Sequence, residues 1–148
     1  MKIHVLGSPG VGKTTLLHLL NGEPFRDLYS QEDVYYDMEN ADIHYEVWDT
    51  RDKEGTDYSQ SSLVILMFDV TQQRSFQYVR NLYLQLHEQV PVLFLGNKRD
   101  LNTTQVYQPW LHALSNQGSP VTYLGWSLKY DFDPFYLRYK VIETLDRW

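Results

Sequence analysis

The stretch KIHVLGSPGVGKTTLLHLL, which begins at Lys2, constrains the fold more than any other part of the chain. Its apolar run at residues 2–6 ends in a glycine, which is typical of a short buried strand. After a glycine-containing loop, residues 13–20 are predicted to form a helix that the pair Asn21-Gly22 ends. Because a strand here passes through a short loop into a helix, we expect helices packed in layers on a sheet.

The same alternation of strand and helix continues along the chain. The expected strands are 2–6, 34–38, 43–49, 63–70, 91–96 and 121–124, and the expected helices are 13–20, 75–89, 109–116 and 134–148. This order predicts an α/β fold in which a mostly parallel sheet carries helices on both faces. One antiparallel hairpin is expected at the edge of the sheet, with its turn at ENAD, residues 39–42.

The last helix has its own signals. Asp133-Pro134 is predicted to supply an N-cap followed by proline at the first helical position. The expected buried stripe of this helix is Leu137, Val141, Leu145 and Trp148. A length of 148 residues suggests one domain, spanning residues 1–148. Ligands of such sheets bind outside the carboxyl ends of the strands, so motifs at those positions are the candidates for function.

Composition excludes several classes of function. The net charge of −6 gives no electrostatic footprint for nucleic acid and no polybasic membrane patch. The absence of cysteine excludes disulfides, cysteine–zinc sites and lipidation on a cysteine in this chain. The longest apolar run, LVILMF at residues 63–68, predicts a buried strand and is too short to span a membrane. We therefore expect a cytoplasmic protein without a membrane anchor in this sequence.

The loop after the first strand carries a phosphate-binding motif. GSPGVGKT, residues 7–14, fits G-x-x-x-x-G-K-[ST] between a strand and a helix, which is the context that the motif requires. Its backbone N–H groups and the helix N-terminus are expected to bind phosphates. Lys13 can reach the β- and γ-phosphates, so it is assigned to catalysis as well as to binding, and the Thr14 hydroxyl can coordinate Mg²⁺. The predicted phosphate-binding residues are Ser8, Pro9, Gly10, Val11, Gly12, Lys13, Thr14 and Thr15.

This motif alone predicts a nucleoside triphosphate without naming the base, and ATPases and nucleotide kinases share it. NKRD, residues 97–100, directly follows a predicted strand. The carboxylate of Asp100 can accept hydrogen bonds from guanine N1–H and its 2-amino group together, a donor pair that adenine lacks. SLK follows the last predicted strand, where backbone N–H groups can meet guanine O6. The predicted base-binding residues are Asn97, Lys98, Asp100, Ser127, Leu128 and Lys129.

With these motifs in this order, the chain resembles the small GTPases of the Ras superfamily, most of all Ras and Rab proteins. The resemblance covers nearly the whole chain and rests on GSPGVGKT, on WDT at residues 48–50, on NKRD and, more loosely, on SLK. It implies one three-layer P-loop GTPase domain that binds GTP or GDP with Mg²⁺. It also implies a monomeric signalling or trafficking switch that works through effector, exchange and activating proteins.

The resemblance assigns further residues. Phe25 lies where the family places an aromatic side chain against the guanine edge. YSQEDVY, residues 29–35, resembles the family's first switch segment, with Ser30 at the position of the magnesium-binding threonine. Asp49 matches the aspartate that holds Mg²⁺ through water. The metal ligands that the resemblance implies are therefore Thr14, Ser30 and Asp49.

The second switch segment departs from the family. Where the family continues with Thr-Ala-Gly-Gln, this chain has Thr50, Arg51, Asp52 and Lys53. Asp52 replaces the glycine whose N–H responds to the γ-phosphate, and its charge would repel phosphate. Lys53 replaces the glutamine that orients the attacking water, and an ammonium group has no acceptor for that water. Slow or impaired intrinsic GTP hydrolysis is therefore expected.

Two interpretations of the cations in this segment stay open. Arg51 or Lys53 can serve as an internal catalytic cation, as a well-placed arginine finger does, or both are solvated charges of a loop. Two smaller departures fall in the binding motifs. Pro9 removes one backbone N–H from the phosphate loop, and Leu128 replaces the family's usual alanine, which leaves backbone contacts available.

Two alternatives to a hydrolysing switch remain from the sequence. One is a scaffold of the pseudo-GTPase type, in which GTP or GDP is a structural ligand that is not hydrolysed, and residues 51–53 favour it. The other is a P-loop ATPase or kinase, against which NKRD argues. The histidines lack the spacing of metal ligands and are expected to serve in packing or at the surface.

Overall fold

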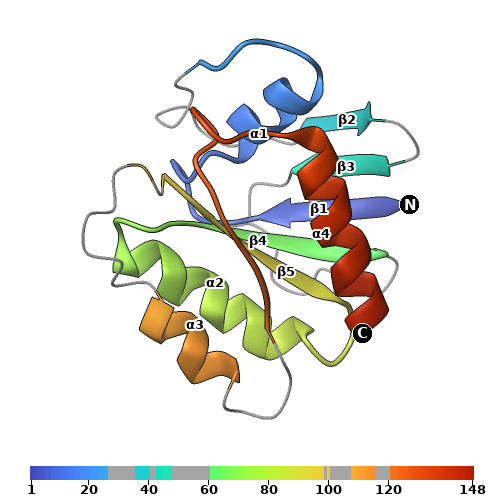
Figure 1. The fold of residues 1–148 in the computed structure, drawn as a ribbon. Helices are drawn as coiled ribbons and strands as arrows, with labels where there is room; N and C mark the ends of the chain where they lie inside the picture. The colour runs from blue at the N-terminus through green and yellow to red at the C-terminus, as the bar shows by residue number, and fades with distance from the viewer. Residues whose placement is uncertain (27–35, 41–42, 48–60, 99, 101–107, 116–120) are drawn as a thin grey trace.

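A computed structural model describes residues 1–26, 36–40, 43–47, 61–98, 100, 108–115 and 121–148. The chain forms a six-stranded sheet in the order β2-β3-β1-β4-β5-β6 (Figure 1). The strands are β1 (Lys2–Leu6), β2 (Tyr36–Asn40), β3 (Ile43–Val47), β4 (Leu63–Asp69), β5 (Val92–Asn97) and β6 (Thr122–Gly125). Every neighbouring pair is parallel except β2–β3, which is antiparallel. The predicted sheet with its edge hairpin is confirmed, but the turn predicted at residues 39–42 is wrong in part, because Glu39 and Asn40 belong to β2 and pair with His44 and Ile43.

Within the described residues, four helices cover the two faces of this sheet. They are α1 (Lys13–Leu20), α2 (Gln73–Leu86), α3 (Gln108–Ser115) and α4 (Pro134–Arg147). Apolar residues of α1 and α4, such as Leu17 and Val141, are buried against Ile3 and Val5 of β1. On the other face, Val79 of α2 and Leu114 of α3 belong to the apolar cluster around β4 and β5. Figure 1 shows α2 and α3 side by side below the sheet, so the fold has the three layers expected for its α/β class.

The boundaries of α2 differ from the prediction. This helix begins at Gln73, two residues before the predicted start at Ser75, and it ends at Leu86. The Ser75 hydroxyl does not cap the helix from outside. It accepts a hydrogen bond from the backbone N–H of Asp69 at 2.9 Å and lies inside the first turn, so it ties the helix to the end of β4.

The end of α4 contains one wrong prediction. Its start is as expected, because the Asp133 carboxylate accepts a hydrogen bond from the N–H of Phe135 at 2.9 Å and Pro134 is the first helical residue. Trp148, however, is 60% exposed instead of buried. The helix ends at Arg147, at the edge of the sheet where β5 and β6 begin, and Trp148 reaches only the rim of a small cavity there.

The carboxyl ends of the five parallel strands lie together at the other end of the sheet from Trp148. The loop after β1, the ends of β4 and β5, and the turn after β6 meet there (Figure 1). In the part of the chain that the structure describes, no helix has the length and apolar character to cross a bilayer.

Candidate functional site

The loop between β1 and α1 depends on three glycines. Gly10 and Gly12 have φ angles of 85° and 111°, in the left-handed region that glycine adopts readily. Gly7 lies against β4, where a Cβ atom would stand only 2.5 Å from the carbonyl oxygen of Met67. A side chain at this position would push the loop away from the sheet. The glycines therefore set both the curl of the loop and its closeness to the strand ends.

The N-terminus of α1 is open to an anion. Gly12 occupies the N-cap position, no side chain caps the helix, and no acidic residue stands in its first turn. The Lys13 ammonium is buried and donates to the carbonyl oxygen of Gly7. The Thr15 hydroxyl oxygen is also buried and has no hydrogen-bond partner among the described residues. A cation, a helix dipole and an unsatisfied hydroxyl are features that fit phosphate groups.

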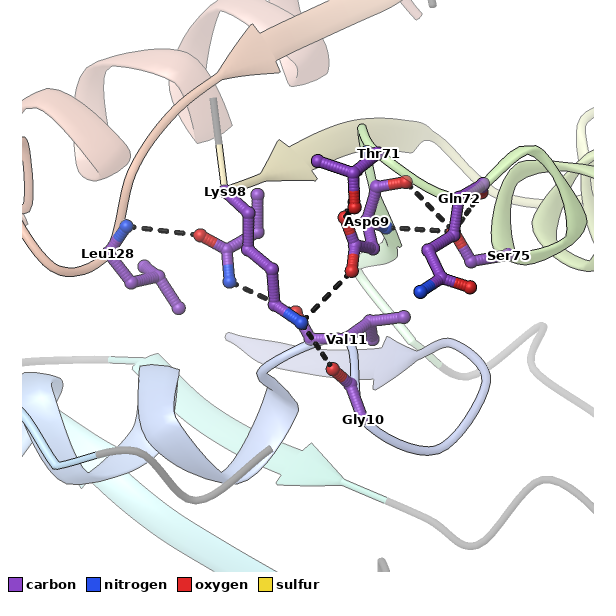
Figure 2. Close-up of polar contacts among 9 residues, drawn as sticks. Gly10, Val11, Asp69, Thr71, Gln72, Ser75, Lys98 and Leu128 are labelled. Atoms are coloured by element: carbon purple, nitrogen blue, oxygen red, sulfur yellow. Dashed lines mark hydrogen bonds and ion pairs between the residues drawn. The ribbon is translucent and has the colours of Figure 1, made fainter. Parts of the chain in front are cut away.

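Asn97 joins three loops. Its Nδ2 donates to the carbonyl oxygen of Val11 at 3.0 Å, and its Oδ1 accepts from the backbone N–H of Leu128 at 3.0 Å (Figure 2). The residue is fully buried at the end of β5. Both ends of one amide are thereby used, so the phosphate loop, the NKRD segment and the SLK segment are held in fixed relation.

Lys98 makes a second connection to the phosphate loop. Its ammonium donates to the carbonyl oxygen of Gly10 at 3.1 Å and pairs with the Asp69 carboxylate at 2.9 Å (Figure 2). Its backbone has a φ of 64°, a left-handed conformation that a non-glycine residue adopts at a cost of roughly 1 kcal/mol or more. Such a conformation persists because the surrounding contacts hold it.

The SLK segment is partly occupied by internal bonds. The backbone N–H of Ser127 donates to the Asp131 carboxylate at 3.0 Å, and that of Leu128 donates to Asn97. Within the described chain, Lys129 has an exposed side chain over the Tyr130 ring and no hydrogen bond. Of the three backbone donors predicted for guanine O6, only that of Lys129 has no acceptor among the residues that the structure describes.

Two further predicted residues lie beside this region. Asp100 is exposed beyond the end of β5, with no partner among the described residues, so its carboxylate is accessible. Phe25 is half-buried and packs against the apolar cluster on the α1 and α4 face.

A cavity of about 400 Å³ lies between the phosphate loop and the N-terminus of α2. Its volume is in the range of small-molecule sites. The lining residues are Ser8, Pro9, Gly10, Val11, Asp69, Gln72, Arg74, Ser75, Tyr78 and Lys98. The lining residues from the end of β4 and the start of α2 were not predicted from the sequence. Asp69 carried a usable signal, because it is an acidic residue at the carboxyl end of a strand that is otherwise apolar.

Several predicted residues lie outside the described part of the chain. They are Ser30, Asp49, Arg51 and Lys53, together with Asp52. Of the three predicted magnesium ligands, only Thr14 is described, and it is half-buried at the start of α1. Within the described residues, no group of three or more His, Asp or Glu side chains is placed to hold a metal ion.

A second buried polar group lies on β1 and β3, away from these loops. His4 Nε2 donates to the Glu46 carboxylate at 3.0 Å, and Lys2 and His44 approach the other oxygen of Glu46 at 3.2 and 3.3 Å. His4 Nδ1 bonds the Ser61 hydroxyl. Burial lowers the pKa of His4 below its ordinary value, although the Glu46 carboxylate opposes this shift.

Burial also affects two tyrosines. It raises the pKa of Tyr45 to about 12 and raises the pKa of Tyr83, because both phenolate forms would be poorly solvated. Both phenols are therefore neutral at physiological pH.

The described fold and loops define an α/β P-loop domain of the GTPase type, with NKRD and SLK segments gathered at the edge of the sheet that carries the phosphate loop. The chain belongs to the Ras family, whose family model matches residues 2–131. The resemblance drawn from the motifs is confirmed.

Relatives agree with this family. GTP-binding protein REM 1 of Homo sapiens is 34% identical, covering 68% of this chain and 40% of the relative. Ras-related protein Rab-27B of Rattus norvegicus is 32% identical, covering 68% and 59%. GTPase RhebL1 of Mus musculus is 32% identical, covering 72% and 67%. The matches thus span from 40% to 67% of the length of these three relatives.

Proposed function

We propose that this chain is a guanine-nucleotide-binding small GTPase that binds GTP or GDP with Mg²⁺ and acts as a signalling or trafficking switch with slow intrinsic hydrolysis. The observation that carries the proposal is the pair of hydrogen bonds from the Asn97 amide. These bonds hold the phosphate loop beside the two segments that would contact a base. A phosphate loop alone is compatible with any nucleotide. The two added segments favour a purine base that is recognised along one edge of its ring.

The proposed binding divides among the loops. The open N-terminus of α1, Lys13 and the Thr15 hydroxyl would hold the phosphates. The accessible Asp100 carboxylate would accept from guanine N1–H and the 2-amino group, and the Lys129 N–H would donate to O6. Phe25 would pack against an edge of the base. Each contact uses a group whose chemistry is complementary to guanine, and adenine would leave Asp100 without donors.

Magnesium would bind at the phosphate end of the site. The Thr14 hydroxyl is the predicted ligand within the described chain, and Ser30 and Asp49 complete the set that the family resemblance implies. The ion would neutralise charge on the β- and γ-phosphates. Lys13 would stabilise the same charge from the protein side. Asp52 and Lys53 in place of glycine and glutamine support slow hydrolysis, because the Asp52 charge would repel the γ-phosphate and the Lys53 ammonium has no acceptor for the attacking water.

The second candidate is a scaffold in which GTP or GDP is held as a structural ligand and not hydrolysed. The specific observation in its favour is the same pair of residues, Asp52 and Lys53. In either case we propose a monomeric cytoplasmic protein whose partners are effectors, exchange proteins or activating proteins, as expected from the family.

One experiment tests the proposal and separates its two forms. Purified protein is loaded with GTP and Mg²⁺, quenched at intervals, and the bound nucleotide is identified. Conversion to GDP over minutes to hours supports a slow switch, and GTP kept intact for a day supports the scaffold. A parallel competition with ATP is the control. Preference for ATP, or no bound nucleotide, would overturn the proposal.

A further inference from the structure

We infer that Asp69 is a positioning residue of the nucleotide site, which holds Lys98 in place and thereby slows the release of bound nucleotide. This inference rests on the proposed function. It concerns the ion pair at the end of β4, which joins a residue that the motifs do not include to the lysine of the NKRD segment (Figure 2).

Both oxygens of the Asp69 carboxylate are held by hydrogen bonds. One oxygen, Oδ1, accepts from the backbone N–H of Thr71 at 2.9 Å and from its hydroxyl at 2.6 Å. The other, Oδ2, accepts from the Lys98 ammonium at 2.9 Å. The Asp69 N–H donates to the Ser75 hydroxyl, which anchors the backbone as well. The carboxylate therefore has one orientation, with Oδ2 directed at Lys98.

The ion pair between Asp69 and Lys98 is largely buried. The side chains of Asp69 and Lys98 are 6% and 16% exposed, so water screens their attraction poorly. A buried carboxylate requires a charged or donating partner, and Lys98 supplies the charge. The pair is thus a constraint on where the Lys98 side chain lies, unlike an exposed ion pair that forms and breaks readily.

Lys98 connects the phosphate loop to the NKRD segment. The same ammonium donates to the Gly10 carbonyl oxygen in the phosphate loop, and the Lys98 backbone stands between Asn97 and the segment that ends at Asp100. By fixing this lysine, Asp69 sets the distance between the part of the site that holds phosphate and the part that holds the base. The left-handed backbone of Lys98 needs such outside support.

The test is a double-mutant cycle on the dissociation rate of a fluorescent GDP analogue from the Mg²⁺-loaded protein. Asp69→Asn keeps the shape of the side chain and removes its charge, and we expect release about tenfold faster than from the wild type. Lys98→Met should also accelerate release. In the Lys98→Met background, Asp69→Asn should add less than about twofold, because its effect acts through Lys98.

The matched control is Asp133→Asn, the same chemical change at the N-cap of α4, where asparagine caps equally well. Its release rate should equal that of the wild type. Equal rates for Asp69→Asn and the wild type, or full multiplication of the two effects in the double variant, would overturn the inference while leaving nucleotide binding intact. Failure of the wild type to bind the analogue would instead overturn the proposed function, and the inference with it.

A measurement on the wild type covers the case in which Asp69→Asn does not fold. An amine-reactive reagent is applied to nucleotide-free protein, and labelling is followed residue by residue by mass spectrometry. Lys98 should react at least about tenfold more slowly than the exposed Lys129, because its ammonium is held by the carboxylate and the Gly10 carbonyl. Equal labelling of the two lysines would show that the pair does not hold Lys98 in solution.

Discussion

The side-chain amide of Asn97 donates to the carbonyl oxygen of Val11 at 3.0 Å, although the two residues are 86 positions apart in the chain. This bond and its counterpart at Leu128 attach the phosphate loop to the segments after β5 and β6. This attachment matters because the phosphate loop can bind any nucleotide, whereas the other two segments are predicted to select the base.

Asn97→Ala should weaken both stability and nucleotide binding. It leaves a buried carbonyl and a buried N–H without partners, so we expect the free energy of unfolding to fall by about 2 kcal/mol. GDP affinity should fall at least about tenfold, because the loops lose their fixed relation. Urea unfolding and GDP titration measure the two effects. Asn81→Ala, on an exposed position of α2, is the control and should change stability by less than about 0.5 kcal/mol. Wild-type affinity in Asn97→Ala would contradict the assigned role.

Asp100→Asn should shift base preference from guanine to xanthine. An amide presents a donor where xanthine carries its 2-carbonyl, while the carboxylate that accepts from the guanine amino group is lost. Competition between GDP and xanthosine diphosphate measures the shift. Asp146→Asn, the same change on an exposed position of α4, should leave the preference as in the wild type. If GDP affinity is unchanged in Asp100→Asn, this carboxylate does not read the base.

Lys53→Gln alone should not restore fast hydrolysis. The glutamine would supply an acceptor for the attacking water, but Asp52 still places a negative charge where the family has a glycine. Single-turnover conversion of bound GTP measures the rate. The double variant Asp52→Gly with Lys53→Gln should hydrolyse faster than either single variant. A large gain from Lys53→Gln alone would show that the charge of Asp52 is not the obstacle.

The buried His4, which pairs with Glu46 between β1 and β3, should make the protein less stable in mild acid. Because the pKa of His4 is lowered in the folded protein, the unfolded chain binds more protons than the folded one as the pH falls below about 6.5. The stability that neutral His4 provides is complete above that pH and is lost as the pH falls through the lower folded-state pKa. The surrounding groups are Lys2, His44, Glu46 and Ser61.

Urea unfolding between about pH 5 and 7.5 tests this expectation. Stability of the wild type should rise with pH across this window, and His4→Gln, which removes the titrating group, should rise less steeply. Parallel curves for the two proteins would show that another group produces the pH dependence.

Most of the architecture was predictable from the sequence, because continuous apolar runs and helical stripes are local signals. The elements were expected in the right order, although β2 at Tyr36–Asn40 and α2 at Gln73–Leu86 are displaced from the predicted ranges 34–38 and 75–89. The burial of Trp148 was not predictable from spacing. The apolar stripe at helical spacing extends in the sequence past Arg147, but the hydrophobic core that the helix covers ends there.

The candidate site divides in the same way. The phosphate loop and NKRD were predictable because each is a contiguous motif whose residue types have a known chemical role. The role of Asp69 was not, because its partner Lys98 is 29 residues away and nothing in the local sequence pairs them. The use of the Leu128 N–H by Asn97 likewise depends on tertiary placement, whereas the bond from the Ser127 N–H to Asp131 is local to the turn after β6.

The large sequence separation between Asn97 and its two hydrogen-bond partners has a consequence for synthesis of the chain. Its two partners stand 86 residues before it and 31 residues after it, so the first bond requires β5 to have joined the sheet and the second also requires the turn after β6. Loop closure over such separations is slow compared with local helix formation. A nascent chain with its phosphate loop already translated would therefore lack a selective site, and capture of guanine nucleotide would mark the completion of folding of the whole domain.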